Sequence, residues 1–516
     1  MVGPVPHVAG RFDRGRALDE LAARRFDLLV IGGGIIGAAT AAHAARAGLA
    51  VALVDAGDFG SATSSASSKL VHGGLRYLRL GDVRLVKEAH HERRILSGAV
   101  APHLVHRMPF LLPLYREGPF RPWFVQSGIL VYSALARSRL NWLVKPARAR
   151  ELVPSLRVEG LRSCALYADA WTNDARLCLA NVRAAAEAGA TVANGAEVVE
   201  LHRPQGVVTG AAVRVDGSVV DVQARVSVNA AGPWVDAVRR LEDARAGTSV
   251  RLSKGVHALV PAPAGWTAAL TVPQDDVRVT FAVPWYGMLL LGTTDSEFEG
   301  DPATVAVEPG DVEQILREAA VALPASCVDP ANVRASFAGL RVLPAGPGES
   351  ASARRETVYS IGPGGMLSVA GGKLTTYRRI ALGALERLRG PLGLARLDTR
   401  PFPLPGADAR PAAPAVEVDP ALAAHLDGLY GTLAPEVLAP AADDPSLLER
   451  LHPDGPDVAA QALYAASHEW ARTAEDVLRR RTLVELQGLA DEATAERTRS
   501  LLARAARQAD AAGRRS

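Results

Sequence analysis

The sequence contains little cysteine, and its cysteines are not spaced to hold a metal ion. The 516 residues include three cysteines, which stand far apart at Cys164, Cys178 and Cys327, with no CxxC pair. Disulfide-rich domains and thiolate zinc sites both need clustered cysteines. The scattered cysteines instead fit free core thiols in a reducing compartment, and we expect no metal site.

The sequence also lacks a long apolar run and a large excess of one charge. Its least charged stretch, 28–45, is interrupted by four glycines, and residues 1–25 carry several charges and no visible signal peptide. A net charge of +3 gives no indication of nucleic-acid binding. Because a membrane-spanning helix needs about 20 apolar residues, we expect a cytoplasmic protein that is soluble or held at a membrane surface.

What the sequence does have is length and apolar content, which predict two or three domains with large cores. Hydrophobic residues make up 48% of the 516. We expect a helix at 173–189 and a strand at 191–201, and alternating strand patterns over 250–345 predict an antiparallel sheet. The expected organisation is an oxidoreductase region 1–400 (nucleotide-binding parts 26–110, 170–250 and 345–400; substrate-side parts 111–169 and 251–344), a linker 401–420, and a helical domain 421–516.

A dinucleotide-binding β–α–β unit is predicted near the N-terminus. An apolar strand leads into Gly32-Gly33-Gly34-Ile35-Ile36-Gly37, an alanine-rich helix follows, and a second apolar strand ends at Asp55. Gly32 permits the tight turn, Gly34 lets backbone approach a pyrophosphate, and Gly37 lets the helix pack close to the strand. The helix N-terminus attracts phosphates, and Asp55 binds a ribose hydroxyl. The alternative is a glycine-rich turn of another α/β protein.

Two later segments indicate that the dinucleotide is a flavin. A strand ends in the small residues of Ala230–Trp234, and the turn Gly371–Thr376 opens a helix. One cofactor contacted by three distant segments fits an extended flavin adenine dinucleotide (FAD). The positive end of the later helix would stabilise the negative charge of reduced flavin. An ordinary loop with a threonine cap is the alternative for that turn.

A hydroxyl-rich segment follows directly after the predicted ribose-binding acid. Six serines or threonines lie within 61–68, and Gly73-Gly74 come shortly after. Composition alone favours a flexible loop. Its position favours hydrogen bonds to phosphate and ribityl oxygens, with the two glycines allowing close approach to the flavin ring.

The run Thr63–Leu78 resembles the signature of FAD-dependent glycerol-3-phosphate dehydrogenases, and the similarity extends over nearly the whole chain. Further motifs similar to that family are Ala101–Leu104, Asp174–Leu177, Ala231–Trp234, Lys254–His257, Gly292–Asp295, Gly339–Arg341, Gly371–Arg378, Ala471–Leu478 and Arg480–Thr482.

The resemblance implies a fold and an activity. The fold is α/β, with an FAD-binding Rossmann-like domain of the glutathione-reductase/D-amino-acid-oxidase type, an antiparallel-sheet substrate domain and a C-terminal all-α domain. The activity is oxidation of sn-glycerol 3-phosphate to dihydroxyacetone phosphate. Electrons pass to a quinone at the inner face of a bacterial membrane, where the protein binds peripherally. A homodimer is one option for the assembly.

The resemblance also implies the site residues. Those expected around the substrate are Arg76, Tyr77, Arg341, Arg355 and Lys373, with Arg354 as an alternative to its neighbour; a phosphate dianion needs several such cations. Those expected at FAD are Gly32, Gly34, Ile35, Ile36, Gly37, Asp55, Thr63, Ser64, Ser65, Ser67, Ser68, Lys69, His72, Gly73, Gly74, Ala231, Gly232, Gly372, Leu374 and Thr375.

The mechanistic hypothesis is hydride transfer from substrate C2 to flavin N5 while a histidine takes the C2 hydroxyl proton. His257 is favoured as the base, and His72 is the second candidate, expected nearer the flavin. Arg341 and Lys373 are expected to stabilise the developing alkoxide.

Other interpretations stay open. Oxygen rather than quinone is the first alternative acceptor, and a non-catalytic flavin-binding protein or an amino-acid oxidase of the same broad fold are others. Asp55 stands where many members of the family carry Glu. Arg479–Arg481 fit either contact with anionic lipids or a solvated face.

Overall fold

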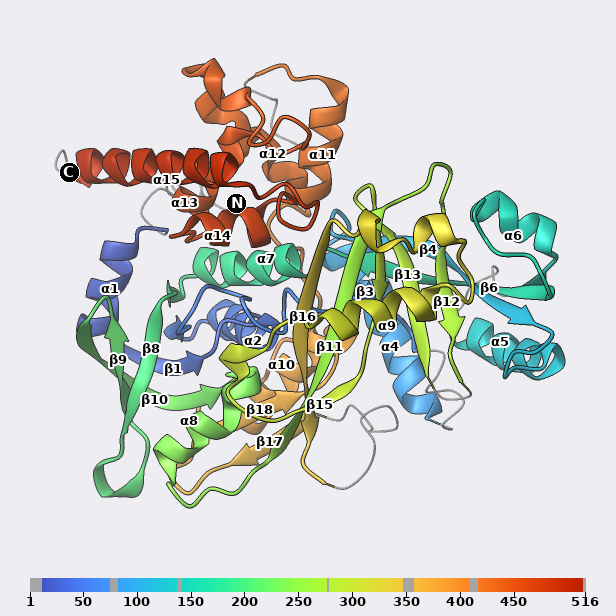
Figure 1. The fold of residues 1–516 in the computed structure, drawn as a ribbon. Coiled ribbons are helices and arrows are strands. Elements are labelled where there is room, and N and C mark those ends of the chain that lie inside the picture. Colours follow the sequence, from blue (N-terminus) through green and yellow to red (C-terminus); the bar gives the residue numbers. More distant parts are fainter. Residues whose placement is uncertain are drawn as a thin grey trace.

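Two β-sheets and a set of C-terminal helices make up the fold (Figure 1). The computed structural model describes residues 12–74, 82–136, 142–275, 278–346, 357–408 and 416–513. All statements below concern these residues. None of the described helices is long and apolar enough to cross a membrane.

The first sheet has a parallel centre. Its described strands run in the order β17 (Thr357–Ile361), β18 (Leu367–Gly371), β10 (Ser218–Asn229), β1 (Arg25–Ile31), β2 (Val51–Val54) and β7 (Thr191–Ala193), with β9 (Gly210–Val215) and β8 (Ala196–His202) continuing from β10. Strands β18, β10, β1, β2 and β7 are parallel, and β17 is an antiparallel edge.

Both faces of this sheet are covered, which explains why its central strands are almost wholly apolar. Helices α2 (Ile35–Arg46), α7 (Asp174–Glu187) and α10 (Tyr377–Arg387) share one buried core with the sheet. Helices α1 (Arg14–Ala23) and α8 (Val235–Glu242) and the β8–β9 hairpin share another. The sequence-based prediction of a Rossmann-like sheet is confirmed.

The second sheet is mainly antiparallel. Its described strands run in the order β15 (Ser296–Phe298), β11 (Val250–Pro261), β14 (Met288–Gly292), β13 (Val279–Trp285), β12 (Ala269–Pro273), β4 (Val105–Tyr115), β6 (Leu161–Thr172) and β3 (Leu70–Val71), with β16 (Ala335–Pro344) paired to β11 and β5 (Trp142–Val144) to β6.

This sheet is larger than the predicted segment 250–345, because β3 to β6 join it from earlier in the chain. The sequence-based organisation placed β3 and the first half of β4 in the nucleotide-binding part. Helices α9 (Pro309–Ala319) and α6 (Pro146–Leu152) pack on one side, and α4 (Val83–Ile95) and α5 (Pro122–Ala136) lie on the other. In Figure 1, α5 and α6 mark the end of the molecule farthest from α1.

Two local predictions can be compared directly with the structure. The helix at 173–189 is α7, with Asn173 as its N-cap accepting a hydrogen bond from the Arg176 N–H at 3.1 Å. The single strand predicted at 191–201 is wrong, since the chain breaks into β7 and β8. At the break Gly195 has φ +55°, and the Asn194 amide donates to Asp58 and to the Trp470 carbonyl.

The C-terminal helices form a domain that lies against α7 (Figure 1). They are α11 (Pro420–Tyr430), α12 (Ala434–Leu438), α13 (Ala459–His468), α14 (Ala474–Asp476), the π-helical turn η12 (Val477–Arg481) and α15 (Glu492–Gly513). Both sequence-based interpretations of Arg479–Arg481 are wrong for the last two residues. Arg480 and Arg481 are buried and paired with Asp58, so they meet neither lipid nor solvent.

Candidate active site

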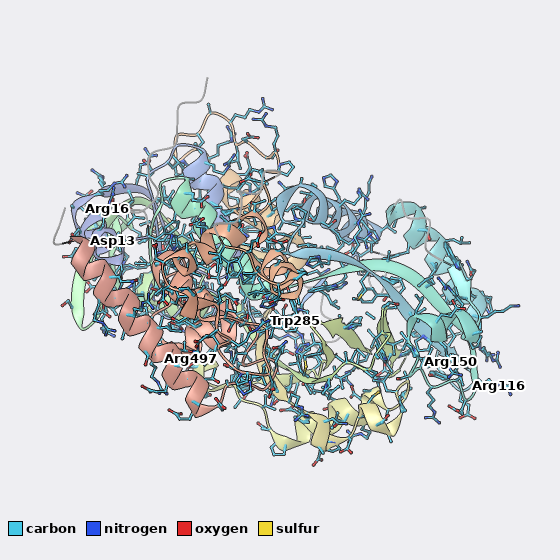
Figure 2. All side chains as sticks on the ribbon, turned by 90° about the horizontal axis from the view of Figure 1, so that it is seen from above. Asp13, Arg16, Arg116, Arg150, Trp285 and Arg497 are labelled. Atoms are coloured by element: carbon cyan, nitrogen blue, oxygen red, sulfur yellow. The ribbon has the colours of Figure 1, made fainter. Side chains whose placement is uncertain are left out.

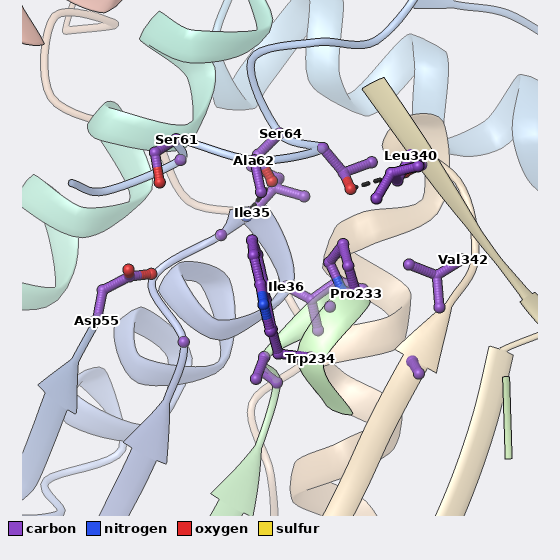
Figure 3. A pocket seen from close by; sticks show the side chains of 18 of the residues that line it. Ile35, Ile36, Asp55, Ser61, Ala62, Ser64, Pro233, Trp234, Leu340 and Val342 are labelled. Carbon is purple, nitrogen blue, oxygen red and sulfur yellow. Dashed lines mark hydrogen bonds between the residues drawn. The ribbon is translucent and has the colours of Figure 1, made fainter. Parts of the chain in front are cut away.

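A cavity of about 850 Å³ lies between the two sheets. The first sheet contributes the carboxyl ends of β1, β2, β10 and β18, and the second contributes β11 and β16. Figure 3 shows Asp55 on one side of this cavity and Val342 on the other, with Trp234 standing between them. Ligands of open α/β sheets bind at such carboxyl ends.

The glycine turn forms a cradle that larger residues would fill. Gly32 has φ +104°, and a Cβ there would lie 2.6 Å from the Ala230 carbonyl oxygen. A Cβ on Gly37 would lie 1.9 Å from the Gly32 carbonyl oxygen, so α2 sits directly on the turn. Gly34 is the N-cap of α2 and lines the cavity. The N-terminal end of α2 therefore opens toward a ligand, and its dipole favours an anion.

Asp55 closes this end of the cavity. Its Oδ2 accepts from the Gly33 N–H at 2.6 Å, and its Oδ1 accepts from the Gly57 N–H at 2.8 Å. Burial raises the pKa of Asp55 to about 6, although these two hydrogen bonds act in the opposite direction. The carboxyl group is thus positioned to accept hydrogen bonds from ribose hydroxyls.

The hydroxyl-rich segment is held by specific hydrogen bonds, against the flexible-loop interpretation. The Ser64 hydroxyl accepts from the Ile35 N–H at 2.9 Å, and the Thr63 hydroxyl donates to the Leu340 carbonyl at 2.8 Å (Figure 3). Further along, the His72 N–H donates to the Thr375 hydroxyl at 3.1 Å. These bonds connect the segment to α2, β16 and the start of α10.

Most residues predicted for the cofactor line this cavity. They are Gly32, Gly34, Ile35, Ile36, Asp55, Thr63, Ser64, Ser67, Ser68, His72, Ala231, Gly232, Gly372, Leu374 and Thr375.

The described residues Gly37, Ser65, Lys69, Gly73 and Gly74 do not line the cavity. Lys69 has φ +55°, which turns its side chain away to a buried ion pair with Asp174 at 2.6 Å. The Gly73 N–H donates to Asp169 at 2.8 Å, behind the cavity wall. Cofactor contact predicted for these five residues stays a prediction, and the Lys69 side chain and the Gly73 N–H are engaged elsewhere in the protein.

At the other end of the cavity, the register of β11 and β16 brings three residue pairs together. Ser253 pairs with Arg341, Gly255 with Gly339, and His257 with Phe337. Because side chains alternate along a strand, these six residues share one face. The intervening residues Val256 and Ala258 belong to the core on the side of α9.

His257 is buried and precisely oriented. Its Nε2 lies 2.9 Å from the Ser68 hydroxyl, and its ring stacks on Phe337 with centroids 5.0 Å apart. Burial, together with the positive charges of Arg341 and Lys69, holds the pKa of His257 well below 6.5. The imidazole is therefore neutral near pH 7 and able to accept a proton.

Arg341 is fixed by several acceptors. Its guanidinium donates to Asp295 at 3.1 Å, to the Thr293 hydroxyl at 2.8 Å and to the Thr294 carbonyl at 3.0 Å. A Cβ on Gly255 would lie 2.4 Å from Arg341 Nη2, so a larger residue there would displace the guanidinium from this position beside β11.

The remaining predicted residues divide into two groups. His72 and Lys373 also line the cavity. Arg76, Tyr77 and Arg355, and the alternative Arg354, lie outside the described residues.

Several residues that shape the site have no individual role predicted from the sequence. Phe337, Ser253 and Asp295 hold His257 and Arg341, and Trp234 lines the cavity. The alternation Ser253, Gly255, His257 along one strand is a signal that a closer inspection of the sequence would find.

Comparisons with known proteins agree with this geometry. The family model described as "FAD dependent oxidoreductase" matches residues 27–378, and that described as "C-terminal domain of alpha-glycerophosphate oxidase" matches 397–512. The chain is 36% identical over 494 residues to glycerol-3-phosphate dehydrogenase 2 of Mycobacterium tuberculosis, covering 93% of this chain and 84% of that one. The chain belongs to the FAD-dependent glycerol-3-phosphate dehydrogenase family.

Two further matches support membership of the family. The glycerol-3-phosphate dehydrogenase of Pseudomonas aeruginosa is 35% identical over 489 residues, covering 90% of this chain and 93% of that one. The crystal structure of the Bacillus halodurans glycerol-3-phosphate dehydrogenase complexed with FAD matches with a TM-score of 0.74 and 27% identity, covering 96% of this chain and 97% of that one.

The residues present fit FAD, the cofactor of this family. The glycine cradle and the N-terminal end of α2 suit the pyrophosphate, and Asp55 suits the ribose. The turn after β18 leads through η8 (Leu374–Thr376) into α10, whose N-terminal end borders the cavity beside Lys373. This arrangement favours negative charge at the far end of the cofactor.

The raised pKa of Asp55 predicts how FAD affinity depends on pH. In the folded protein the pKa of Asp55 is about 6, above the ordinary 3.8. Asp55 therefore adds to the stability of the folded apoprotein at low pH. This stabilisation is lost as pH rises through about 6. Ribose hydroxyls bind the ionised form better, so affinity for FAD should fall as pH decreases below about 6, by up to about tenfold per unit. Fluorescence titration of the apoprotein with FAD at several pH values measures this affinity. The variant Asp55→Asn should show a flatter dependence of FAD affinity on pH. An equally steep dependence in the variant would contradict the assignment of Asp55 to the ribose.

Proposed function

We propose that the chain oxidises sn-glycerol 3-phosphate to dihydroxyacetone phosphate and passes the electrons to a quinone at a membrane surface. The observation that carries the proposal is the joint position of His257 and Arg341 on one face of β11 and β16, at the cavity that fits FAD. A neutral base and a fixed guanidinium together suit an alcohol that carries a phosphate group.

The substrate phosphate needs cationic partners. Arg341 and Lys373 line the cavity, and the Arg341 guanidinium places a positive charge there in a position fixed by Asp295 and Thr293. We propose that both also stabilise negative charge developing on the substrate C2 oxygen. Arg76, Tyr77 and Arg355 stay predicted members of the same group.

FAD, when bound, supplies the acceptor for the hydride that leaves C2. His257 takes the proton of the C2 hydroxyl. Ser68 and Phe337 fix the plane of its ring. A phosphate dianion bound at Arg341 would offset the positive charge that lowers the pKa of His257. Substrate binding would in this way make the histidine a stronger base when it is needed.

A surface feature supports the membrane part of the proposal. Helix α5 contains no charged residue in its 15 positions. Its outward stripe holds Trp123, Phe124, Leu130 and Val131, of which the first is 73% exposed and the third 58%. Apolar residues at helical spacing on the outer face fit a helix that lies in the plane of a bilayer interface.

The charges around α5 complement an anionic lipid surface. The exposed basic residues in the segment that leads into α5 are Arg116 and Arg121, and the exposed acidic residue there is Glu117. Figure 2 shows Arg116 and Arg150 at the end of the molecule opposite Asp13 and Arg16. Each basic residue close to anionic lipid contributes about 1 kcal/mol. We propose this surface as the site of peripheral binding.

Anaerobic mixing of the FAD-loaded protein with glycerol 3-phosphate tests the proposed reaction. The visible absorbance of the oxidised flavin should bleach within a turnover. His257→Asn should slow bleaching by about 10²- to 10⁴-fold, the usual contribution of a general base, while the substrate concentration for half-maximal rate changes little.

The acceptor is tested on the same reduced enzyme. Fast reoxidation by a short-chain quinone with slow peroxide formation is expected. Rapid peroxide formation in air would instead favour the oxidase, and a flavin that stays oxidised with glycerol 3-phosphate would refute the substrate assignment.

Vesicle sedimentation tests the membrane surface. Wild-type protein should bind vesicles containing phosphatidylglycerol and bind neutral phosphatidylcholine vesicles much less. The double variant Trp123→Gln/Leu130→Gln should lose most of this binding and keep its activity with a soluble acceptor. The control Val219→Gln/Ile361→Gln removes apolar residues that are also more than half exposed elsewhere on the surface, and it should bind normally. Equal loss of binding in both double variants would contradict the role of α5.

A further inference from the structure

The segment that follows β2 faces two ways. Residues Asp55, Ala56, Gly57, Gly60 and Ser61 line the cavity. The side chains between them, Asp58 and Phe59, are buried on the other side, against the C-terminal domain. This short segment is therefore a wall shared by the cofactor cavity and the domain interface.

Asp58 is surrounded by cationic groups from the C-terminal domain. Its carboxylate accepts from Arg480 Nε at 2.5 Å and from Arg481 Nη2 at 2.8 Å, and a second nitrogen of Arg481 also contacts it. Asn194 donates to the same carboxylate at 3.1 Å. Burial alone would raise the pKa of Asp58, but the two arginines outweigh it and lower the pKa below its ordinary value.

The arginines are themselves fixed within the C-terminal domain. Arg480 donates to Asp476 at 2.6 Å, and Arg481 donates to the Glu469 carbonyl at 2.6 Å. Both arginines lie on η12. Their guanidinium groups are therefore already oriented to bind Asp58 when the domain is docked. Without the Asp58 carboxylate, a docked domain would bury the two arginine charges with fewer negative charges to neutralise them.

Phe59 provides a second connection. Its ring lies over the glycine turn, where a Cβ on Gly33 would come within 2.3 Å of Phe59 Cδ1. The ring also makes a T-shaped contact with Trp470 from the C-terminal domain, with centroids 5.5 Å apart. Gly33 in turn donates its N–H to Asp55. A continuous row of contacts thus runs from Trp470 through Phe59 and Gly33 to the ribose-binding carboxylate.

We propose that the C-terminal domain is part of the FAD site: Arg480, Arg481 and Trp470 hold the segment 55–61 in the conformation that receives the ribose and pyrophosphate, so domain docking and FAD binding are thermodynamically coupled. These are positioning residues, because they act through Asp58 and Phe59. Coupling between two sites is reciprocal, so bound FAD also strengthens docking of the domain.

The test compares FAD affinity among full-length variants. Asp58→Asn and Arg481→Gln each should raise the dissociation constant of FAD on the order of tenfold, within the usual range for coupled sites. Both should also reduce the rise in melting temperature that FAD produces. With saturating FAD, kcat and KM for glycerol 3-phosphate should stay close to wild type. Arg481→Lys, which keeps the charge, should restore part of the affinity.

Arg183→Gln is the matched control. Arg183 of α7 pairs with Glu436 of α12 at 3.2 Å, so it also connects the C-terminal domain to the rest of the chain but does not touch 55–61. This variant should melt at lower temperature and bind FAD with a dissociation constant close to wild type. If either Asp58→Asn or Arg481→Gln does not fold, Trp470→Leu tests the Phe59 contact by the same titration. Unchanged affinity in the folded variants, or equal weakening by Arg183→Gln, would overturn the proposal.

Discussion

The burial of His257 beside Arg341 is the constraint on which the chemistry of the site depends. An imidazole in water is half protonated near pH 6.5, but here burial and a neighbouring guanidinium keep it neutral. A neutral ring is required of a base, and a fixed cation is required to bind a phosphate. In the proposed reaction this pair of neighbours satisfies both requirements, and bound substrate would change the balance between them.

The strand register and two glycines of the second sheet are enough to produce this arrangement. The register of β11 against β16 places Ser253, Gly255 and His257 opposite Arg341, Gly339 and Phe337. Two glycines in the middle of the row leave space, one for the Arg341 guanidinium and one for the Ala66 carbonyl of the hydroxyl-rich segment. The parallel sheet supplies the cofactor end independently, through the turn after β1 and the acid after β2. The residues predicted for the cofactor and those proposed for the substrate line one cavity because it lies between the two sheets.

Local sequence patterns predicted the parts of the site whose geometry is local. The glycine turn, Asp55 and the turn before α10 all lie where the β–α–β pattern and the motifs indicated. The direction of the Lys69 side chain could not be predicted, because proximity along the chain does not reveal the left-handed backbone angle that sends it to Asp174. The contact between Asp58 and Arg481 joins residues 423 positions apart, so nothing local in the sequence could show that the C-terminal arginines are buried.

The protonation state of His257 is the most direct test of the account. Proton and nitrogen NMR of histidine-labelled, FAD-loaded protein measures it, with His257→Asn used to assign the signal. We expect an imidazole that stays neutral as pH is lowered through 6.5, because the pKa of His257 lies well below that value. A signal that titrates at or above 6.5 in the substrate-free protein would contradict the account.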